Sequence, residues 1–302
     1  MKILSHISLL LTFLIVLTTS CKKEGYNQPN ADCYLVHSED DLYGYSFDIM
    51  YNSTGNPASI DLAGFPVSLE YDASGRLSKA YYGSAGARLE FFYSYNTFLP
   101  TVRKYIRPDF GGLISVDSFS YNIVGQRTKM ITHILLSGAD NKLIYKYQYD
   151  NRGNLKKLTS ATVTNGIESS PELVFEGLRY DNKYNALSGN QWLKYLFDLT
   201  DFTDYSYLQF SVNNALDWKW YYGDDIAYSV TSSLIYNSQG FANTRNGHYF
   251  DTDGVTELAS FTQLNISSCD ATAPRLTQKA SIFKNRKTGK WEIFQLPFIN
   301  KQ

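Results

Sequence analysis

The chain has 302 residues, a formal net charge of −1, 43% hydrophobic residues and 25 tyrosines. Such a length can bury the core of one large domain, and a near-neutral balance provides no broad basic field, which excludes a typical nucleic-acid-binding surface. The sequence has no His-Glu-x-x-His, Cys-x-x-Cys, Gly-x-Ser-x-Gly or phosphate-binding glycine motif. We therefore expect no metal, no cofactor and no catalytic residue.

The first segment, 1–20, is typical of a bacterial lipoprotein signal. Lys2 precedes an apolar run, Ile7 to Leu17, whose 11 residues are too few for a membrane-spanning helix of about 20. Two small residues, Thr19 and Ser20, lead directly into Cys21, as in a lipobox. We predict lipidation of Cys21, with an ordinary cleaved secretory signal as the alternative. Acyl chains would anchor the protein without a spanning helix.

The segment after the signal predicts a linker and a location. Residues 21–32 are polar, with glycine and proline, and are typical of a flexible tether. Lys23 and Glu24 partly resemble a surface-display signal of Bacteroidetes lipoproteins, so we predict an outer-membrane lipoprotein, with display on the cell surface favoured and the periplasmic face as the alternative. The remaining cysteines, Cys33 and Cys269, either form a disulfide that ties the first strand to the last or stay as buried thiols.

A short unit, Tyr-Asp/Asn-x-x-Gly, recurs along residues 33–270. Its tyrosines are 20, 24, 26, 28, 31 and 56 residues apart, the last being twice 28. A period in this range marks a repeated supersecondary unit. The copies begin at Tyr51, Tyr71, Tyr121, Tyr149 and Tyr236, with degenerate copies at Tyr95 and Tyr180.

The residues before each repeated tyrosine alternate between apolar and polar, as in Leu143, Tyr145, Tyr147 and Tyr149. This period of two predicts strands with one buried face. The Asp or Asn side chain would accept a hydrogen bond from the backbone two residues on, and the glycine would supply a positive φ. We therefore predict an all-β, antiparallel, up-and-down meander of hairpins that forms a curled or barrel-like sheet.

Two stretches depart from this pattern. Residues 191–203 carry apolar side chains every three to four positions, which predicts a short helix lying across the sheet. The C-terminal segment 271–302 has no repeat unit, and we interpret it as a last strand near Trp291 or a tail.

The quoted motifs resemble two known families. The sequences YDASGRL and YDNRGNL are similar to YD repeats of the Rhs type. The whole layout resembles an uncharacterised family of Bacteroidetes lipoproteins with a porin-like fold. Two further elements of that family are matched here by residues 180–185 and by 211–214, YDNKYN and SVNN. The resemblance implies a β-meander curled toward a barrel and brings no known activity. A true outer-membrane barrel is a competing interpretation, but a lipid anchor would be redundant there.

The aromatic residues provide the candidate ligand contacts. Rows of tyrosine at strand spacing more often pack within a sheet than bind a ligand. Aromatic residues on the polar phase, such as Tyr82, Phe92 and Tyr221, are the candidates for exposed contacts. We name Trp218, Trp220 and Tyr221 as possible ligand contacts.

Three functions follow as hypotheses. The first is a non-catalytic surface lipoprotein, held at the membrane by its lipid, that binds a glycan or an envelope protein. The second is a structural or assembly component of the envelope. The third is a glycoside-active enzyme, for which the sequence provides no catalytic signature. Asp251 and Asp253 could begin a calcium loop, but an Asp-Gly turn needs no ion.

Overall fold

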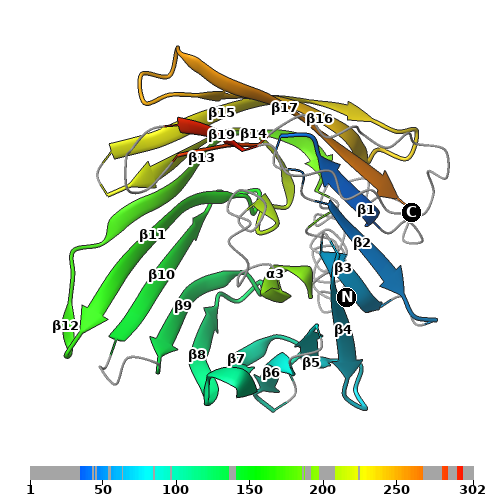
Figure 1. The fold of residues 1–302 in the computed structure, drawn as a ribbon, viewed down its shortest axis with the longest axis vertical. Helices are drawn as coiled ribbons and strands as arrows, with labels where there is room; N and C mark the ends of the chain where they lie inside the picture. Colours follow the sequence, from blue (N-terminus) through cyan, green and yellow to red (C-terminus); the bar gives the residue numbers. More distant parts are fainter. Residues whose placement is uncertain are drawn as a thin grey trace, which may run out of the picture.

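The protein is a closed antiparallel β-barrel (Figure 1). The computed structural model describes residues 35–42, 44, 46–53, 56–62, 64–83, 86–95, 97–135, 141–185, 187, 192–196, 208–223, 225–267, 281–284 and 291–294. Within these residues 16 strands form the ring. Each strand pairs with its neighbours in the chain, and the first strand pairs with the last to close it. The predicted all-β meander is confirmed.

The ring runs in chain order from β1 to β11 and from β13 to β17, while the two-residue β12 only extends the pairing of β11. Its strands are β1 (Leu35–Asp40), β2 (Ser46–Tyr51), β3 (Pro57–Leu62), β4 (Phe65–Tyr71), β5 (Leu77–Tyr82), β6 (Ala87–Tyr93), β7 (Pro100–Arg107), β8 (Gly112–Tyr121), β9 (Arg127–Ile134), β10 (Asn141–Tyr149), β11 (Leu155–Thr164), β12 (Ile167–Glu168), β13 (Glu172–Tyr184), β14 (Asn213–Tyr222), β15 (Asp225–Tyr236), β16 (Ala242–Phe250) and β17 (Glu257–Ser267). A 3-10 turn, η1 (Pro108–Phe110), joins β7 to β8.

The repeat units form one turn geometry, used again and again. In the unit at Asp72, Oδ1 accepts hydrogen bonds from the amides of Ser74 and Arg76, both at 2.9 Å. The backbone closes the same loop, since the Asp72 amide donates to the Arg76 carbonyl at 2.8 Å. Gly75 adopts a φ of +76°, which a side chain would strain. Asn122, Asp150 and Asn237 build the same turn, so the predicted turn chemistry is confirmed.

The tyrosine of most units ties one strand to its neighbour, whereas Tyr236 donates to the Asp181 carboxylate. The Tyr71 hydroxyl donates to the carbonyl of Pro57, the first residue of β3, at 2.7 Å. Tyr149 donates to Arg127, the first residue of β9, in the same way at 2.9 Å. Strand register also shifts by one residue at these tyrosines, as between Glu70 and Tyr71. Such bulges increase the local twist, which helps a sheet to close on itself.

One predicted copy is assigned to the wrong tyrosine. Tyr93, and not Tyr95, makes the equivalent bond, because its hydroxyl donates to the carbonyl of Leu77 at 2.6 Å. Tyr95 is 92% exposed and lies in the turn beyond β6. The sequence YSYNTFL places two tyrosines in the same phase, so the period-two pattern cannot distinguish them.

The other degenerate copy, at Tyr180, is a turn that has been opened by an insertion. Asp181 Oδ1 accepts from the amide of Lys183, two residues on, at 3.0 Å. Its second bond comes from the amide of Asn214 at 3.0 Å, where an ordinary unit would use residue 185. The 29 residues from 185 to 213 are therefore inserted into the turn. Subtracting them reduces the spacing of 56 between Tyr180 and Tyr236 to 27, which is an ordinary repeat.

The described part of the insertion lies inside the barrel. It contains the short helix α3 (Leu193–Leu196), which lies inside the ring of strands (Figure 1). The side chains of Trp192, Leu193 and Tyr195 are buried completely or almost so. The predicted helix is thus present, but it lies within the lumen rather than across an open sheet, because the buried face of a closed sheet is its inside. We call the described insertion residues 185, 187, 192–196 and 208–213 the plug.

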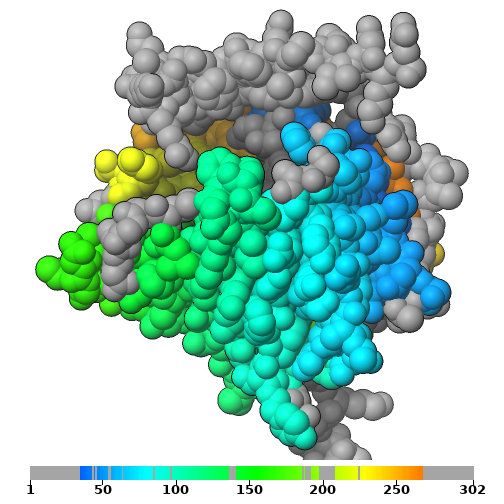
Figure 2. All heavy atoms as spheres, turned by 60° about the horizontal axis from the view of Figure 1, so that its bottom comes forward, coloured from blue at the N-terminus to red at the C-terminus, as the bar shows by residue number. Residues whose placement is uncertain are grey.

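The plug is needed because a 16-strand barrel is wider than its wall side chains can fill; barrels of this size otherwise enclose water. The wall turns apolar residues such as Ile60, Leu77 and Leu89 toward the plug, and all three are fully buried. Figure 2 shows the outer surface of the wall, with neighbouring hairpins packed side by side.

Outside the ring, β18 (Ser281–Lys284) and β19 (Trp291–Phe294) pair only with each other. The strand expected near Trp291 is therefore present, but it belongs to a separate two-stranded sheet. Among the described residues, the structure contains no helix of the length and apolar character that crossing a membrane requires.

Candidate functional site

Polar side chains of the inner wall hold the plug. Arg103 and Asp117 are both buried and form an ion pair on β7 and β8, with Nε and Oδ2 separated by 2.8 Å. The Arg103 guanidinium also donates to the Tyr195 carbonyl of the plug. Thr132 donates to the second oxygen of Asp117 at 2.6 Å. A buried charge requires such compensation, so this group fixes both the wall and the position of α3.

A second buried arginine lies among aromatic rings. The Arg127 guanidinium carbon lies 4.5 Å from the ring centre of Phe119 and 4.8 Å from those of Tyr195 and Phe210. Tyr147 contributes a fourth ring at 5.7 Å. Rings favour a cation over their faces. Because Tyr195 and Phe210 belong to the plug and the other two to the wall, this cluster joins both ends of the insertion to the barrel.

Hydrogen bonds of asparagine residues hold the two ends of the insertion together. The amide of Asn185 donates to the Val212 carbonyl at 2.9 Å, so the chain leaves and returns at one point. The Asn213 amide donates to Oδ1 of Asn154 at 2.8 Å, and the Ser211 hydroxyl accepts from the Leu155 amide at 3.0 Å. The two family-like motifs, residues 180–185 and 211–214, are thus brought together on the turn at 150–154. Their role in the fold is to seat the plug.

The outer face of the wall carries charges in register. These residues alternate along their strands with buried ones such as Leu69, Ala80 and Leu89. In two rows, residues of opposite charge lie opposite each other on paired strands. One row crosses four strands and consists of Glu70, Lys79, Glu90 and Lys104. The other crosses three strands and consists of Lys157, Glu176 and Lys219. Lys157 Nζ lies 3.4 Å from Glu176 Oε1. The outer face of these strands therefore carries paired charges, whereas their inner face packs apolar side chains into the core.

Two of the three predicted ligand contacts are core residues. Trp218 is 1% exposed and Trp220 is 7% exposed, on the inner face of β14. Trp220 packs edge-on against Phe175 with ring centres 5.7 Å apart. Neither ring offers a face to a ligand in this structure. Tyr221 points to the outer face and donates to Glu176 at 3.0 Å; burial, and then that bond, raise the pKa of Tyr221 to about 12.

The other aromatic candidates divide between the two faces. Phe92 is 42% exposed on the outer face, with the Lys104 ammonium 4.8 Å from its ring centre. Tyr82 instead pairs with buried Val67 and packs against the core, so its expected outward position is wrong. The bulge at Tyr71 changes the phase of β5, which the alternation alone does not reveal.

The cysteine predictions fall on Cys21, Cys33 and Cys269, and all three lie outside the described residues. The same holds for the signal at 1–20 and the tether at 21–32. These predictions remain predictions.

The described residues contain no group of three or more His, Cys, Asp or Glu that could hold a metal ion. In the predicted calcium-like turn, Asp253 accepts hydrogen bonds from the amides of Val255 and Thr256, each at 2.8 Å. The Thr256 hydroxyl adds a bond of 2.6 Å, and these contacts lower the pKa of Asp253. The carboxylate thus orders the turn by itself.

The two ends of the barrel differ. One, which we call the turn end, carries the repeat turns at residues 52–56, 72–76, 94–99, 122–126, 150–154 and 237–241. Because β1 starts here and β17 finishes here, the chain enters and leaves the barrel at this end. The opposite, far end carries the loops between β3 and β4, β5 and β6, β7 and β8, and the hairpins that continue this series.

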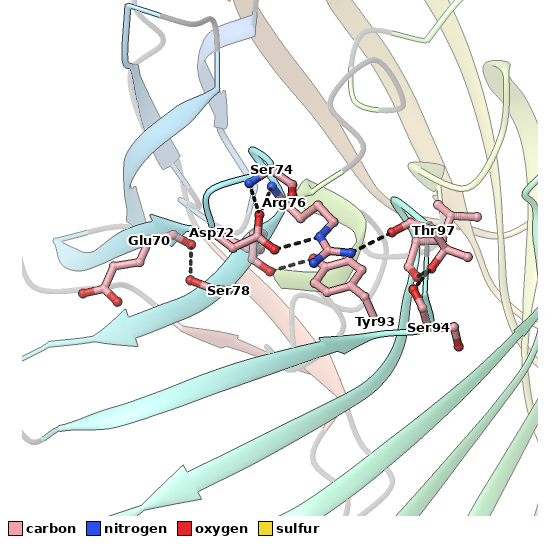
Figure 3. A network of polar contacts seen from close by, with 10 residues as sticks. Glu70, Asp72, Ser74, Arg76, Ser78, Tyr93, Ser94 and Thr97 are labelled. Carbon is pink, nitrogen blue, oxygen red and sulfur yellow. Dashed lines mark hydrogen bonds and ion pairs between the residues drawn. The ribbon is translucent and has the colours of Figure 1, made fainter.

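Neighbouring turns contact one another at the turn end, as Figure 3 shows. Arg76 Nε lies 2.7 Å from Asp72 Oδ2, and its Nη1 reaches the carbonyl of Thr97 in the next turn at 3.3 Å. The same guanidinium lies 4.6 Å from the ring centre of Tyr93. These contacts join the turn at 72–76 to the next turn of the rim, at 94–99.

Solved structures with the same architecture exist, although no family model and no curated protein matches the sequence. A porin-like protein from Bacteroides uniformis is similar over 80% of this chain and 99% of its own, with 9% identity and a TM-score of 0.52. At this identity the likeness shows the fold alone. A porin-like protein from Bacteroides vulgatus covers 76% of this chain and 97% of its own, at 12% identity and a TM-score of 0.45, which is too low to carry an argument.

Proposed function

We propose that this chain is a non-catalytic envelope lipoprotein, anchored through lipid on Cys21, whose filled barrel stands outside the bilayer and presents its loops to a partner. The porin-like fold is consistent with an envelope protein. The lipobox-like sequence before Cys21 supports the anchor. An outer-membrane location on the cell surface follows the partial match at Lys23 and Glu24.

The charged outer wall is the observation that carries the proposal. A barrel that spans a bilayer needs an apolar outer band about 25 Å tall, and a lysine at the bilayer centre costs about 2–4 kcal/mol. Lys79, Lys104 and Lys219 lie within strands on this face, together with Glu90 and Glu176. Several such costs would add, while the apolar side chains that could offset them pack inside against the plug.

The far end is the surface that the proposal assigns to a partner. Its loops expose large apolar side chains on separate hairpins, among them Phe65, Phe110 and Tyr222. Exposed rings of this kind can stack on a sugar or anchor a protein interface. A glycan or an envelope protein is therefore the class of partner we propose, with these rings in place of the buried Trp218 and Trp220.

Acyl labelling tests the anchor and ligand capture tests the partner. We expect radiolabelled palmitate to be incorporated into the wild-type chain and absent from Cys21→Ala. We also expect a glycan or envelope protein to bind saturably and to lose at least tenfold in affinity in Tyr222→Ala with Phe65→Ala. Tyr95→Ala, at the opposite end, is the matched control. Labelling that persists in Cys21→Ala would reject the anchor, and equal affinity of all three proteins would reject the assigned surface.

A further inference from the structure

The turn end carries a compact exposed apolar surface. Tyr95 and Phe98 lie in the turn between β6 and β7, and Ile123 and Val124 lie in the next turn, between β8 and β9. Ile123 is fully exposed and Val124 is 72% exposed. Together we call these four residues the apolar tip.

The two turns of the apolar tip lie side by side. They belong to consecutive hairpins, because β7 and β8 are paired. A methyl group added to Gly125 would come within 3.3 Å of the Leu99 side chain. At the far end, the ring of exposed Phe110 is instead covered on one side by Arg107, whose guanidinium carbon lies 4.2 Å from the ring centre.

The position of the chain start argues for a membrane as the occupant. The barrel begins at Leu35 on the turn end, because the carbonyl of Leu35 accepts from Tyr51 there at 2.8 Å. Thirteen residues separate Leu35 from Cys21, which even when fully extended span at most about 45 Å. Lipid attached at Cys21 therefore keeps the turn end within reach of the bilayer.

The apolar tip and the chain start lie across the rim from each other. In the ring order, β7 and β8 are about half-way round from the seam between β1 and β17. Two attachments on opposite sides of a rim would hold the barrel axis upright, whereas a single tether would let the barrel swing. Exposed Lys183, also at the turn end, adds a positive charge suited to anionic headgroups.

We propose that the apolar tip inserts into the lipid surface, so that the anchored barrel is seated with its turn end against the membrane and its far end directed away. The inference rests on the proposed lipid anchor for its biological setting. Partial burial of isoleucine, valine and two aromatic rings in the interface supplies the attraction, and the tether supplies the high local concentration.

An artificial anchor separates this proposal from acylation itself. The Cys21→Ser chain would carry an N-terminal hexahistidine tag in place of the signal and bind vesicles of phosphatidylethanolamine, phosphatidylglycerol and a nickel-chelating lipid. Two variants would each carry one additional tryptophan, Ile123→Trp in the apolar tip and Val255→Trp at the far end. Quenching of the fluorescence of this additional tryptophan by lipids with brominated acyl chains would then be compared between the two variants. Both positions are largely exposed, so each accommodates the ring.

We expect the brominated lipid to quench the fluorescence added by Ile123→Trp at least twofold and to leave that of Val255→Trp unchanged, after subtraction of the parent chain. Equal quenching at both positions, or no quenching at Ile123→Trp, would overturn the seated orientation. Neither result depends on whether Cys21 is acylated in the cell, which palmitate labelling decides separately.

Discussion

At the scale of single residues, the repeat is a rule of hydrogen bonding. The Asp or Asn of each unit orders a turn, and in most units the tyrosine hydroxyl donates to a carbonyl of the preceding strand of the ring. The turn chemistry could be predicted from sequence because it is local. The partner of the tyrosine hydroxyl could not, since the accepting carbonyl lies on another strand, and neither could the choice of Tyr93 over Tyr95.

The tyrosine bond predicts a loss of stability in Tyr149→Phe. Removing the hydroxyl leaves the Arg127 carbonyl without this donor, which we expect to lower the free energy of unfolding by about 1–2 kcal/mol. Urea denaturation measures it. Tyr95→Phe, in the exposed turn, is the control and should change stability by less than about 0.5 kcal/mol. If Tyr95→Phe lowered the free energy of unfolding as much as Tyr149→Phe does, the assignment of Tyr93 rather than Tyr95 to the repeat would be contradicted.

We expect the repeat turns that are built on Asp to lose stability in acid and the turns that are built on Asn not to. Burial acts to raise the pKa of Asp72, but bonds from Arg76 and Ser74 outweigh it and lower the pKa. Ionised Asp72 thus stabilises the fold above the unfolded value of about 3.9, and this contribution is lost as the pH falls through the folded pKa. Asp72→Asn should keep the turn, as Asn122 does, and flatten the decline in melting temperature between about pH 5 and 2.

The reverse change provides the control for that measurement. Asn122→Asp places a carboxylate where two amides already donate, so its melting temperature should fall more steeply in acid than that of the wild type. Identical pH profiles for all three proteins would show that the turn carboxylates do not stabilise the fold.

At the scale of elements, the wall and the plug were predictable to different degrees. The strands follow from alternation, and a short helix near residue 193 follows from its spacing. The location of that helix inside the barrel depends on closure, a long-range event. The insertion was hidden because its length happened to imitate a second repeat period between Tyr180 and Tyr236. Trp218 and Trp220, which we named as ligand contacts, alternate with Asp217 and Lys219 and so follow the buried phase of β14.

The ion pair beneath the plug predicts a non-additive pair of substitutions. Asp117→Leu leaves Arg103 as a buried charge without its carboxylate, and we expect it to cost about 3–5 kcal/mol of unfolding free energy. Arg103→Met combined with Asp117→Leu should be less destabilised than Asp117→Leu alone. If the double variant had a lower free energy of unfolding than Asp117→Leu, this expectation would be contradicted, because removing the unpaired Arg103 charge would not have restored stability.

The seam between β1 and β17 bears on the predicted disulfide. Leu35 pairs with Ser267 in the antiparallel register, and Cys33 and Cys269 are each two positions from this pair in the sequence, outside the described residues. We predict that Cys33 and Cys269 form a disulfide. Non-reducing peptide mapping would detect the linked peptides, and Cys33→Ser with Cys269→Ser should lower stability by about 2–5 kcal/mol. Two free thiols in the oxidised, folded protein would refute the bridge.

At the scale of the whole molecule, charged side chains lie in rows on the face that an outer-membrane barrel covers with an apolar band. A sheet of porin-like form surrounds an apolar core with a plug, and charged rows run along its outside. The alternation in the sequence predicted which residues would be buried but not the closed ring of strands. The function that we propose requires the barrel to stay outside the bilayer, with a lipid anchor at Cys21 and its turn end against the membrane.

Sedimentation equilibrium without detergent tests this central claim most directly. The Cys21→Ser chain lacking residues 1–20 should remain monomeric in aqueous buffer, with the circular dichroism of a β-rich fold. Its charged outer wall needs neither lipid nor micelle in our account. A protein that precipitates in buffer, becomes monomeric only in detergent micelles and then inserts into planar bilayers would contradict it.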